Sequence, residues 1–109
     1  MTTLHSTYGD LQITDAHVHL WDLTKMNYPW LDQVPAIKCS FGLPEFQAAT
    51  EGLPVSNMVF LQCECLPGEY QTEIDYVTEL AREDPRIRGI VAYFPLEAAD
   101  ADEKLSILS

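Results

Sequence analysis

Two histidines separated by one residue follow an acidic side chain near the start of the sequence, in Asp15-Ala-His17-Val-His19. Side chains alternate between the two faces of a β-strand, so Asp15, His17 and His19 are expected to share one face. Two imidazole nitrogens converging from positions i and i+2 can supply half of a tetrahedral zinc shell and leave a position open for water. The spacing therefore predicts a metal site at His17 and His19, with Asp15 orienting the site or bracing the strand. A hydrogen-bonded structural role for both histidines is the alternative.

The histidine pair lies at the end of a predicted strand, Leu11–His19, in which apolar and polar residues alternate. Two further buried strands are predicted at 57–62 and 90–94, because both runs are apolar, rich in strand formers and bounded by proline. A helix is predicted over 69–83. Its apolar side chains recur every three or four residues, and three acids are placed on its outer face: Glu73, Glu79 and Glu83.

Strands that alternate with helices indicate an α/β fold with parallel pairing through right-handed crossovers, and apolar strands indicate that both sheet faces are covered. A short helix beginning near Pro44 and ended by Gly52 is predicted between the first two strands. Residues 98–109 have the pattern of the start of another helix. The expected architecture is one domain with about three parallel strands, preceded by a flexible tail at residues 1–9.

Weaker functional candidates follow the first two predicted strands. The long connection from residue 20 to residue 42 is rich in aromatic side chains, and Trp21 is a candidate wall of a pocket for a ring-shaped ligand. Packing that anchors the loop is the alternative for Trp21. Gln62 and Glu64 follow the second strand and are candidate substrate-binding residues, with a solvated loop acid as the alternative for Glu64. Cys63 and Cys65 are expected to be buried, inert thiols.

Charge and composition exclude several classes of partner. The chain has 17 acidic and 6 basic residues, a formal net charge of -11, which repels nucleic acid and anionic membrane surfaces. No stretch approaches the roughly 18 apolar residues that a membrane span needs. The three cysteines are odd in number and lack the spacing of a disulfide framework, so a reducing, cytoplasmic location is expected.

Four segments together resemble a known family. The run Asp15-Ala-His-Val-His-Leu-Trp-Asp22 resembles the opening motif of the amidohydrolase superfamily, in the amidohydrolase 2 branch that includes sugar-lactone and pyrone-dicarboxylate lactonases. Three later segments resemble that branch's first loop, second strand and third strand, and they are Tyr28-Pro-Trp-Leu31, Val59-Phe-Leu-Gln-Cys-Glu64 and Arg88-Gly-Ile-Val91.

The resemblance implies that residues 10–109 are the N-terminal part of a (β/α)₈ TIM barrel, with its site at the C-terminal ends of the strands. It implies a hydrolase that acts on a lactone or a related cyclic ester, so that its small-molecule substrate is a lactone or a carboxylate. In that family the histidines matching His17 and His19 bind a divalent metal such as zinc or, in metal-independent lactonases, help to hold the substrate.

The resemblance ends before the family's catalytic machinery is complete. No residue of this sequence matches the family's later histidine or the aspartate of its eighth strand, so the catalytic base is unknown. A closed barrel takes about 250 residues, and the 109-residue chain alone is therefore expected to be inactive and to self-associate or bind a partner chain. The alternative is a non-catalytic truncated paralogue or fragment that works with a partner.

Overall fold

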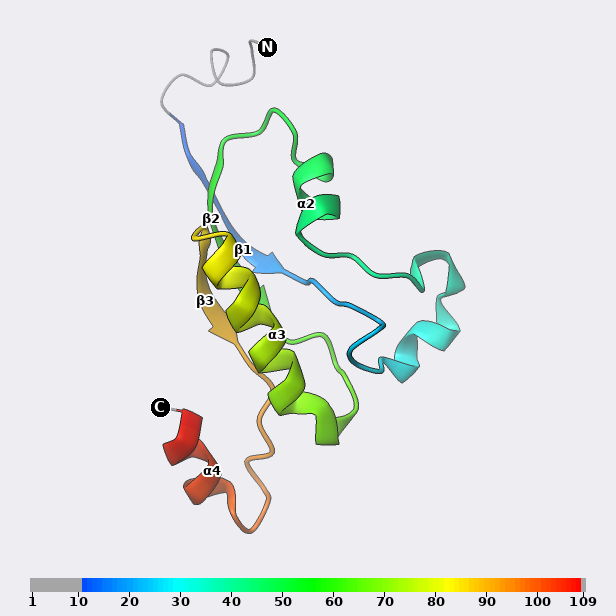
Figure 1. The fold of residues 1–109 in the computed structure, drawn as a ribbon, viewed down its shortest axis with the longest axis vertical. Helices are drawn as coiled ribbons and strands as arrows, with labels where there is room; N and C mark the ends of the chain where they lie inside the picture. The colour runs from blue at the N-terminus through cyan, green and yellow to red at the C-terminus, as the bar shows by residue number, and fades with distance from the viewer. Residues whose placement is uncertain (1–10, 109) are drawn as a thin grey trace.

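A computed structural model describes residues 11–108, which form a parallel three-stranded sheet with helices between the strands (Figure 1). The predicted tail at residues 1–9 lies outside the described residues. The sheet has the order β1-β2-β3, with β1 at Ile13–Val18, β2 at Val55–Leu61 and β3 at Ile87–Val91. Both pairings are parallel, which confirms the predicted α/β fold with three strands.

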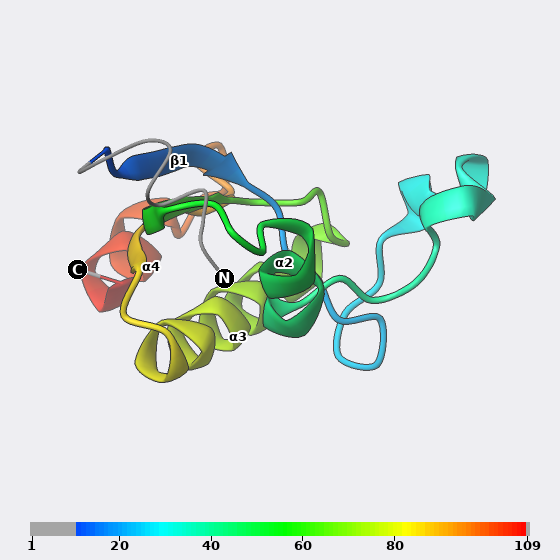
Figure 2. The same ribbon diagram turned by 90° about the horizontal axis from the view of Figure 1, so that it is seen from above.

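The three helices connect or follow the strands, and they are α2 at Leu43–Ala49, α3 at Tyr70–Glu83 and α4 at Ala101–Leu108. Short 3-10 turns occupy Pro29–Gln33 (η1), Pro35–Ile37 (η2) and Pro67–Glu69 (η3). Seen from above, α2 and α3 lie on the same side of the sheet (Figure 2). Within residues 11–108 no helix covers the opposite face, contrary to the prediction that both faces are covered. One bare face is what a barrel sheet presents toward its interior.

The core lies between the covered face of the sheet and α3. Met58 and Phe60 alternate on β2 and are almost fully buried, as is Val77 of α3. The loop after β1 adds a second set of buried side chains, namely Leu20, Trp21, Met26, Tyr28 and Leu31. These apolar contacts fix the loop onto the end of the sheet at which the strands finish.

The two ends of the loop between β1 and α2 are joined to each other. Trp21 and Phe41 exchange two backbone hydrogen bonds, of 2.9 and 3.0 Å, in an isolated antiparallel bridge. The helix that follows was predicted near Pro44. Its first turn is stabilised because the Glu45 carboxylate accepts a 2.7 Å hydrogen bond from the Gly42 amide. Gly52 has a φ of 83° in the turn that leads to β2, a conformation that favours glycine.

The third strand lies three residues earlier than predicted. Ile87 pairs with Met58 at the start of β3, and the strand ends at Val91. The aromatic side chains that had suggested a strand to residue 94 pack instead on α3, where the Tyr70 ring lies 6.3 Å from that of Tyr93 and 5.6 Å from that of Phe94. Sequence pattern alone did not separate strand residues from aromatic residues that pack on a neighbouring helix.

The placement of Glu73 on the outer face of α3 was also wrong. Its side chain is only 2% exposed and points toward the core with Val77, four residues later. Burial of this acid is compatible with the fold because two donors from other segments bind its carboxylate. The spacing of the apolar residues had predicted a buried face of α3 that did not include Glu73. The face that is buried in the structure includes both Glu73 and Val77.

The described chain is open in shape. Its radius of gyration is 16.1 Å, whereas a closed domain of this length has about 13 Å. Large apolar side chains stand in solvent along its length, including Leu11, Val91, Leu96 and Ile107. In the described part of the chain, every helix is too short or too polar to cross a membrane.

Candidate functional site

His17, in β1, and His19, just after it, have ring nitrogens that lie close together. The Nε2 atoms of His17 and His19 lie 3.0 Å apart, and the ring planes meet at 78° with centroids separated by 4.8 Å. Both side chains are exposed on the described chain. The predicted convergence of the pair is therefore present, although β1 ends at Val18 and His19 already belongs to the loop.

The second nitrogen of His19 is held by the neighbouring strand. His19 Nδ1 lies 3.1 Å from the carbonyl oxygen of Leu61, at the end of β2. A carbonyl oxygen only accepts hydrogen bonds, so Nδ1 carries the proton and Nε2 presents its lone pair. The Nε2 lone pair of His19 therefore faces His17 Nε2, 3.0 Å away.

The histidine geometry suits two ligands of one metal ion. With zinc–nitrogen bonds of about 2.0–2.1 Å, two ligand nitrogens lie about 2.9–3.4 Å apart, depending on the angle at the ion. The observed separation of 3.0 Å falls in this range. A hydrogen bond from the other ring nitrogen to a backbone carbonyl, as at His19, is the usual second contact of a metal-binding histidine.

Two candidate metal ligands, His17 and His19, lie together in the described residues. Among residues 11–108 no group of three or more histidine, cysteine and acidic side chains is placed to hold an ion. Asp15 is close in sequence, but its Oδ1 atom accepts a 3.2 Å hydrogen bond from the His17 backbone amide. Asp15 thus braces the strand, one of the two roles considered for it.

Gln62 and Glu64 lie together just beyond β2. The Glu64 amide donates a 2.7 Å hydrogen bond to the Gln62 side-chain oxygen, and the Gln62 amide group lies 3.4 Å from Glu64 Oε1. Glu64 has a φ of 61°, the one positive value at a non-glycine residue in the described range. Such strain is often found at functional positions. Both side chains line a groove of about 280 Å³ that is walled by Trp30 and Tyr93.

Trp21 lies apart from this groove. Its side chain is 8% exposed, packs edge-on against Trp30 and Phe41, and donates a 2.6 Å hydrogen bond from Nε1 to the Cys39 carbonyl. These are the contacts of a loop anchor. Trp21 nevertheless shares a hollow of about 480 Å³ with His19, so its role in binding substrate stays a prediction.

One large groove of the described residues is not lined by the histidines. It has a volume of about 740 Å³ and runs between α2 and α3, past Asp22, Lys25, Tyr76 and Glu79. It lies on the helix side of the sheet, whereas parallel barrels place their sites at the carboxyl ends of the strands. We therefore centre the candidate site on the histidine pair rather than on this groove.

Glu73 is a polar residue near the site that sequence reasoning missed. Its Oε2 atom accepts a 2.8 Å hydrogen bond from Tyr28 Oη and one of 3.2 Å from the Cys63 amide. Burial raises the pKa of Glu73, while the hydrogen bonds from Tyr28 and Cys63 oppose that rise. The signal that could have found it is the four-residue spacing from Glu73 to Val77, a residue that was predicted to be apolar and inward.

The two thiols beside the site are poor nucleophiles. Burial raises the pKa of Cys63 to about 12 and that of Cys65 to about 11. Cys63 is 4% exposed and Cys65 is half-buried. Because the thiolate is the reactive form, both groups are inert near neutral pH, as was expected of them.

The comparisons with known proteins identify the fold. No protein-family model and no curated protein matches the chain. A solved structure, amidohydrolase 2 from Bifidobacterium longum subsp. infantis, matches with a TM-score of 0.62 and 21% sequence identity. The fold is that of a partial TIM barrel. The match covers 81% of this chain and 38% of the amidohydrolase, so the chain spans well under half of the protein that it resembles.

At 21% identity this likeness carries the architecture and not the chemistry. It confirms the predicted α/β fold, with three parallel strands of a partial TIM barrel. The lactonase-like branch, the metal and the substrate stay predictions.

Proposed function

We propose that this chain contributes the first strands and the histidine pair of an amidohydrolase-like hydrolase. The observation that carries the proposal is the pair of Nε2 atoms 3.0 Å apart at the carboxyl end of β1, in a sheet with amidohydrolase architecture. That edge of the sheet is where barrel enzymes hold their reacting groups.

His17 and His19 are the proposed ligands of a divalent metal such as zinc. When bound there, the ion would polarise a substrate carbonyl and lower the pKa of a bound water. His19 already has the required tautomer, because Leu61 holds the proton on its Nδ1 atom. His17 has to present its Nε2 lone pair to the ion in place of the contact it now makes with His19. A metal-independent role, in which the pair binds the substrate directly, is the competing form of the proposal.

The proposed substrate is a lactone or a related cyclic ester. Gln62 offers an amide that can donate to a substrate oxygen, and its position beside Glu64 in the aromatic groove supports a binding role. Trp21 would contact the substrate through the hollow that it shares with His19. No residue of this sequence is proposed as the catalytic base.

The unclosed sheet supports association of this chain with a second copy or with a partner protein that supplies more strands. β1 and β3 are the outer strands of the described sheet, and Val91 at the end of β3 is 53% exposed. Unpaired strand edges and exposed apolar side chains favour pairing. The three free thiols are consistent with the proposed reducing, cytoplasmic location.

Zinc titration tests the metal proposal on the 109-residue chain. Calorimetry should detect weak binding to the parent chain, because two ligands leave the coordination shell incomplete. His17→Ala together with His19→Ala should abolish it, while Cys39→Ala, which removes an exposed thiol elsewhere, should leave it unchanged. Equal zinc affinity in the parent and the double variant would remove the metal site.

Hydrolysis of a lactone panel tests the catalytic part. The chain alone should show only the uncatalysed rate, since a barrel site needs groups from several strand ends. Adding the remaining part of an amidohydrolase barrel in trans should produce turnover that His17→Ala reduces. Hydrolysis by the purified 109-residue chain that disappears in His17→Ala would show instead that this chain is a complete small enzyme.

A further inference from the structure

Glu73 is a buried carboxylate to which the proposed reaction gives no role. Its side chain is 2% exposed, and one oxygen, Oε2, accepts hydrogen bonds from Tyr28 Oη at 2.8 Å and the Cys63 amide at 3.2 Å. The donors come from segments that are far apart in sequence, the loop after β1 and the loop after β2. A buried acid is costly to retain in a core, so these bonds have to compensate for its lost hydration.

Cys63 connects this carboxylate to the histidine pair. Its Sγ atom lies 3.6 Å from His19 Nδ1, on the same nitrogen that contacts the Leu61 carbonyl at 3.1 Å. Sγ also contacts the Leu61 carbonyl oxygen at 3.4 Å and that of Leu20 at 3.6 Å. The position of Cys63 therefore sets where its sulfur lies beside His19 Nδ1, next to the carbonyl of Leu61, the last residue of β2.

We propose that Glu73 is a positioning residue for His19. By binding the Cys63 amide, it holds the first residues after β2 so that the Cys63 sulfur lies beside Nδ1, together with the carbonyl of Leu61 at the end of β2. The proton is thereby kept on Nδ1, and the lone pair of Nε2 is directed toward His17. Only the use of that lone pair for a metal rests on the proposed function.

The surrounding contacts show that Glu73 acts between two loops rather than within one. Trp30 Nε1 donates a 2.8 Å hydrogen bond to the Cys63 carbonyl. The loop after β1 therefore contacts the Cys63 carbonyl directly, and it reaches the Cys63 amide through Tyr28 and Glu73. One helical turn earlier, Glu69 binds the amide and the side chain of Asn27 at 2.6 and 2.9 Å. Glu69 holds the same loop, but its hydrogen bonds go to Asn27 and not to Cys63.

This difference between the two acids provides the control. Glu73→Ala removes the acceptor shared by Tyr28 and Cys63, whereas Glu73→Gln keeps a side-chain oxygen that can accept from both. Glu69→Ala loosens the first loop without removing a contact of Cys63. Glu73→Asp retains the charge but shortens the side chain by one methylene group, so it cannot reach both donors.

The experiment is nitrogen-15 NMR of the imidazole groups in the metal-free 109-residue chain, combined with zinc titration. The parent, Glu73→Gln and Glu69→Ala should all show His19 protonated on Nδ1. Glu73→Ala should shift His19 toward the Nε2-protonated tautomer that free imidazole side chains prefer in water. Zinc affinity should fall about 10- to 100-fold in Glu73→Ala, the usual effect of losing an outer-shell contact, and by less than about threefold in Glu73→Gln.

The outcomes separate this inference from the proposed function. An unchanged His19 tautomer in Glu73→Ala overturns the positioning role. If circular dichroism shows that Glu73→Ala does not fold, the His19 tautomer is measured in Glu73→Asp instead, where the same change is expected. A tautomer change that Glu69→Ala reproduces also overturns it, since loosening of the first loop would then be sufficient. A tautomer change specific to Glu73, in a parent chain that binds no zinc, supports the positioning role and removes the metal proposal instead.

Discussion

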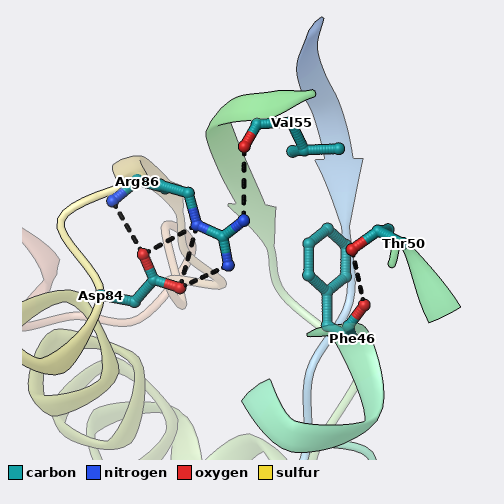
Figure 3. A network of polar contacts seen from close by, with 5 residues as sticks. All are labelled: Phe46, Thr50, Val55, Asp84 and Arg86. Carbon is teal, nitrogen blue, oxygen red and sulfur yellow. Dashed lines mark hydrogen bonds and ion pairs between the residues drawn. The ribbon is translucent and has the colours of Figure 1, made fainter. Parts of the chain in front are cut away.

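The two ends of the sheet use polar side chains differently. Where β2 and β3 begin, Arg86 makes three bonds to the two carboxylate oxygens of Asp84 at 2.7–3.1 Å and donates to the Val55 carbonyl at 3.3 Å (Figure 3). The guanidinium also lies 6.0 Å from the Phe46 ring centroid. Where β1 ends, the Nε2 atoms of His17 and His19 face only each other among the contacts of the described chain.

This contrast distinguishes a structural polar cluster from a candidate functional one. At the starting end, every oxygen of Asp84 is used within the fold, and the cluster ties the end of α3 to β2 and β3. At the finishing end, the two Nε2 atoms face each other on side chains that are exposed. Barrel folds generally place stability at the amino ends of their strands and chemistry at the carboxyl ends, and the candidate site lies at the carboxyl end.

The largest expected effect is at the starting end. Arg86→Ala leaves Asp84, which is 9% exposed, without its cationic partner and removes the contact with Phe46. We expect the free energy of unfolding, measured by urea denaturation, to fall by about 2–3 kcal/mol. Arg82→Ala is the matched control, because Arg82 pairs with Glu79 on the exposed surface of α3 and should change stability by less than about 0.5 kcal/mol. Equal losses in the two variants would contradict the contrast.

His17→Ala should change zinc affinity more than it changes stability, the opposite of what is expected for Arg86→Ala. The side chain is exposed and its one ring contact is with His19, so the free energy of unfolding should change by less than about 0.5 kcal/mol. Zinc affinity should fall at least about tenfold, equivalent to about 1.4 kcal/mol. Calorimetry and urea denaturation on the same preparation measure both. A large loss of stability would assign the histidine pair a structural role.

The acid at the starting end should stabilise the fold more as the pH rises. Hydrogen bonds from Arg86 hold the pKa of Asp84 below its ordinary value. The ionised Asp84 therefore contributes its full stabilisation above about pH 4, the pKa of Asp in the unfolded chain. This stabilisation is lost as the pH falls from there through the lower pKa of Asp84 in the folded chain. Urea denaturation from pH 7 to pH 3 should show the parent approaching Asp84→Asn in stability at the acidic end. A constant difference would contradict this assignment.

The buried acid near the finishing end should have the opposite slope. Burial raises the pKa of Glu73, so the folded chain retains a proton that the unfolded chain has lost. The destabilisation from this group begins as the pH rises past about 4.3 and is complete above the folded pKa. Relative to the parent, Glu73→Gln should gain stability between pH 4 and pH 7, the smallest of these effects. A difference that shrinks with rising pH would show that the hydrogen bonds outweigh burial.

Sequence alone determined the features that depend on neighbours along the chain. The convergence of His17 and His19 follows from their spacing, the helix over 69–83 from its apolar period, and the alternation of strands and helices from the order of such segments. The motif around the histidines also suggested part of a TIM barrel, and the structural match confirms that fold.

Tertiary structure decided the features that depend on distant segments. The start of β3 is set by the pairing of Ile87 with Met58, and its end by aromatic rings that pack on α3, neither of which a local pattern records. Glu73 looked like a surface acid because its partners, Tyr28 and Cys63, are 45 and 10 residues away. The tautomer of His19 likewise depends on a carbonyl 42 residues later. A periodic pattern shows which face of an element is apolar, but only the packed structure shows which polar groups find partners and which are left available for chemistry.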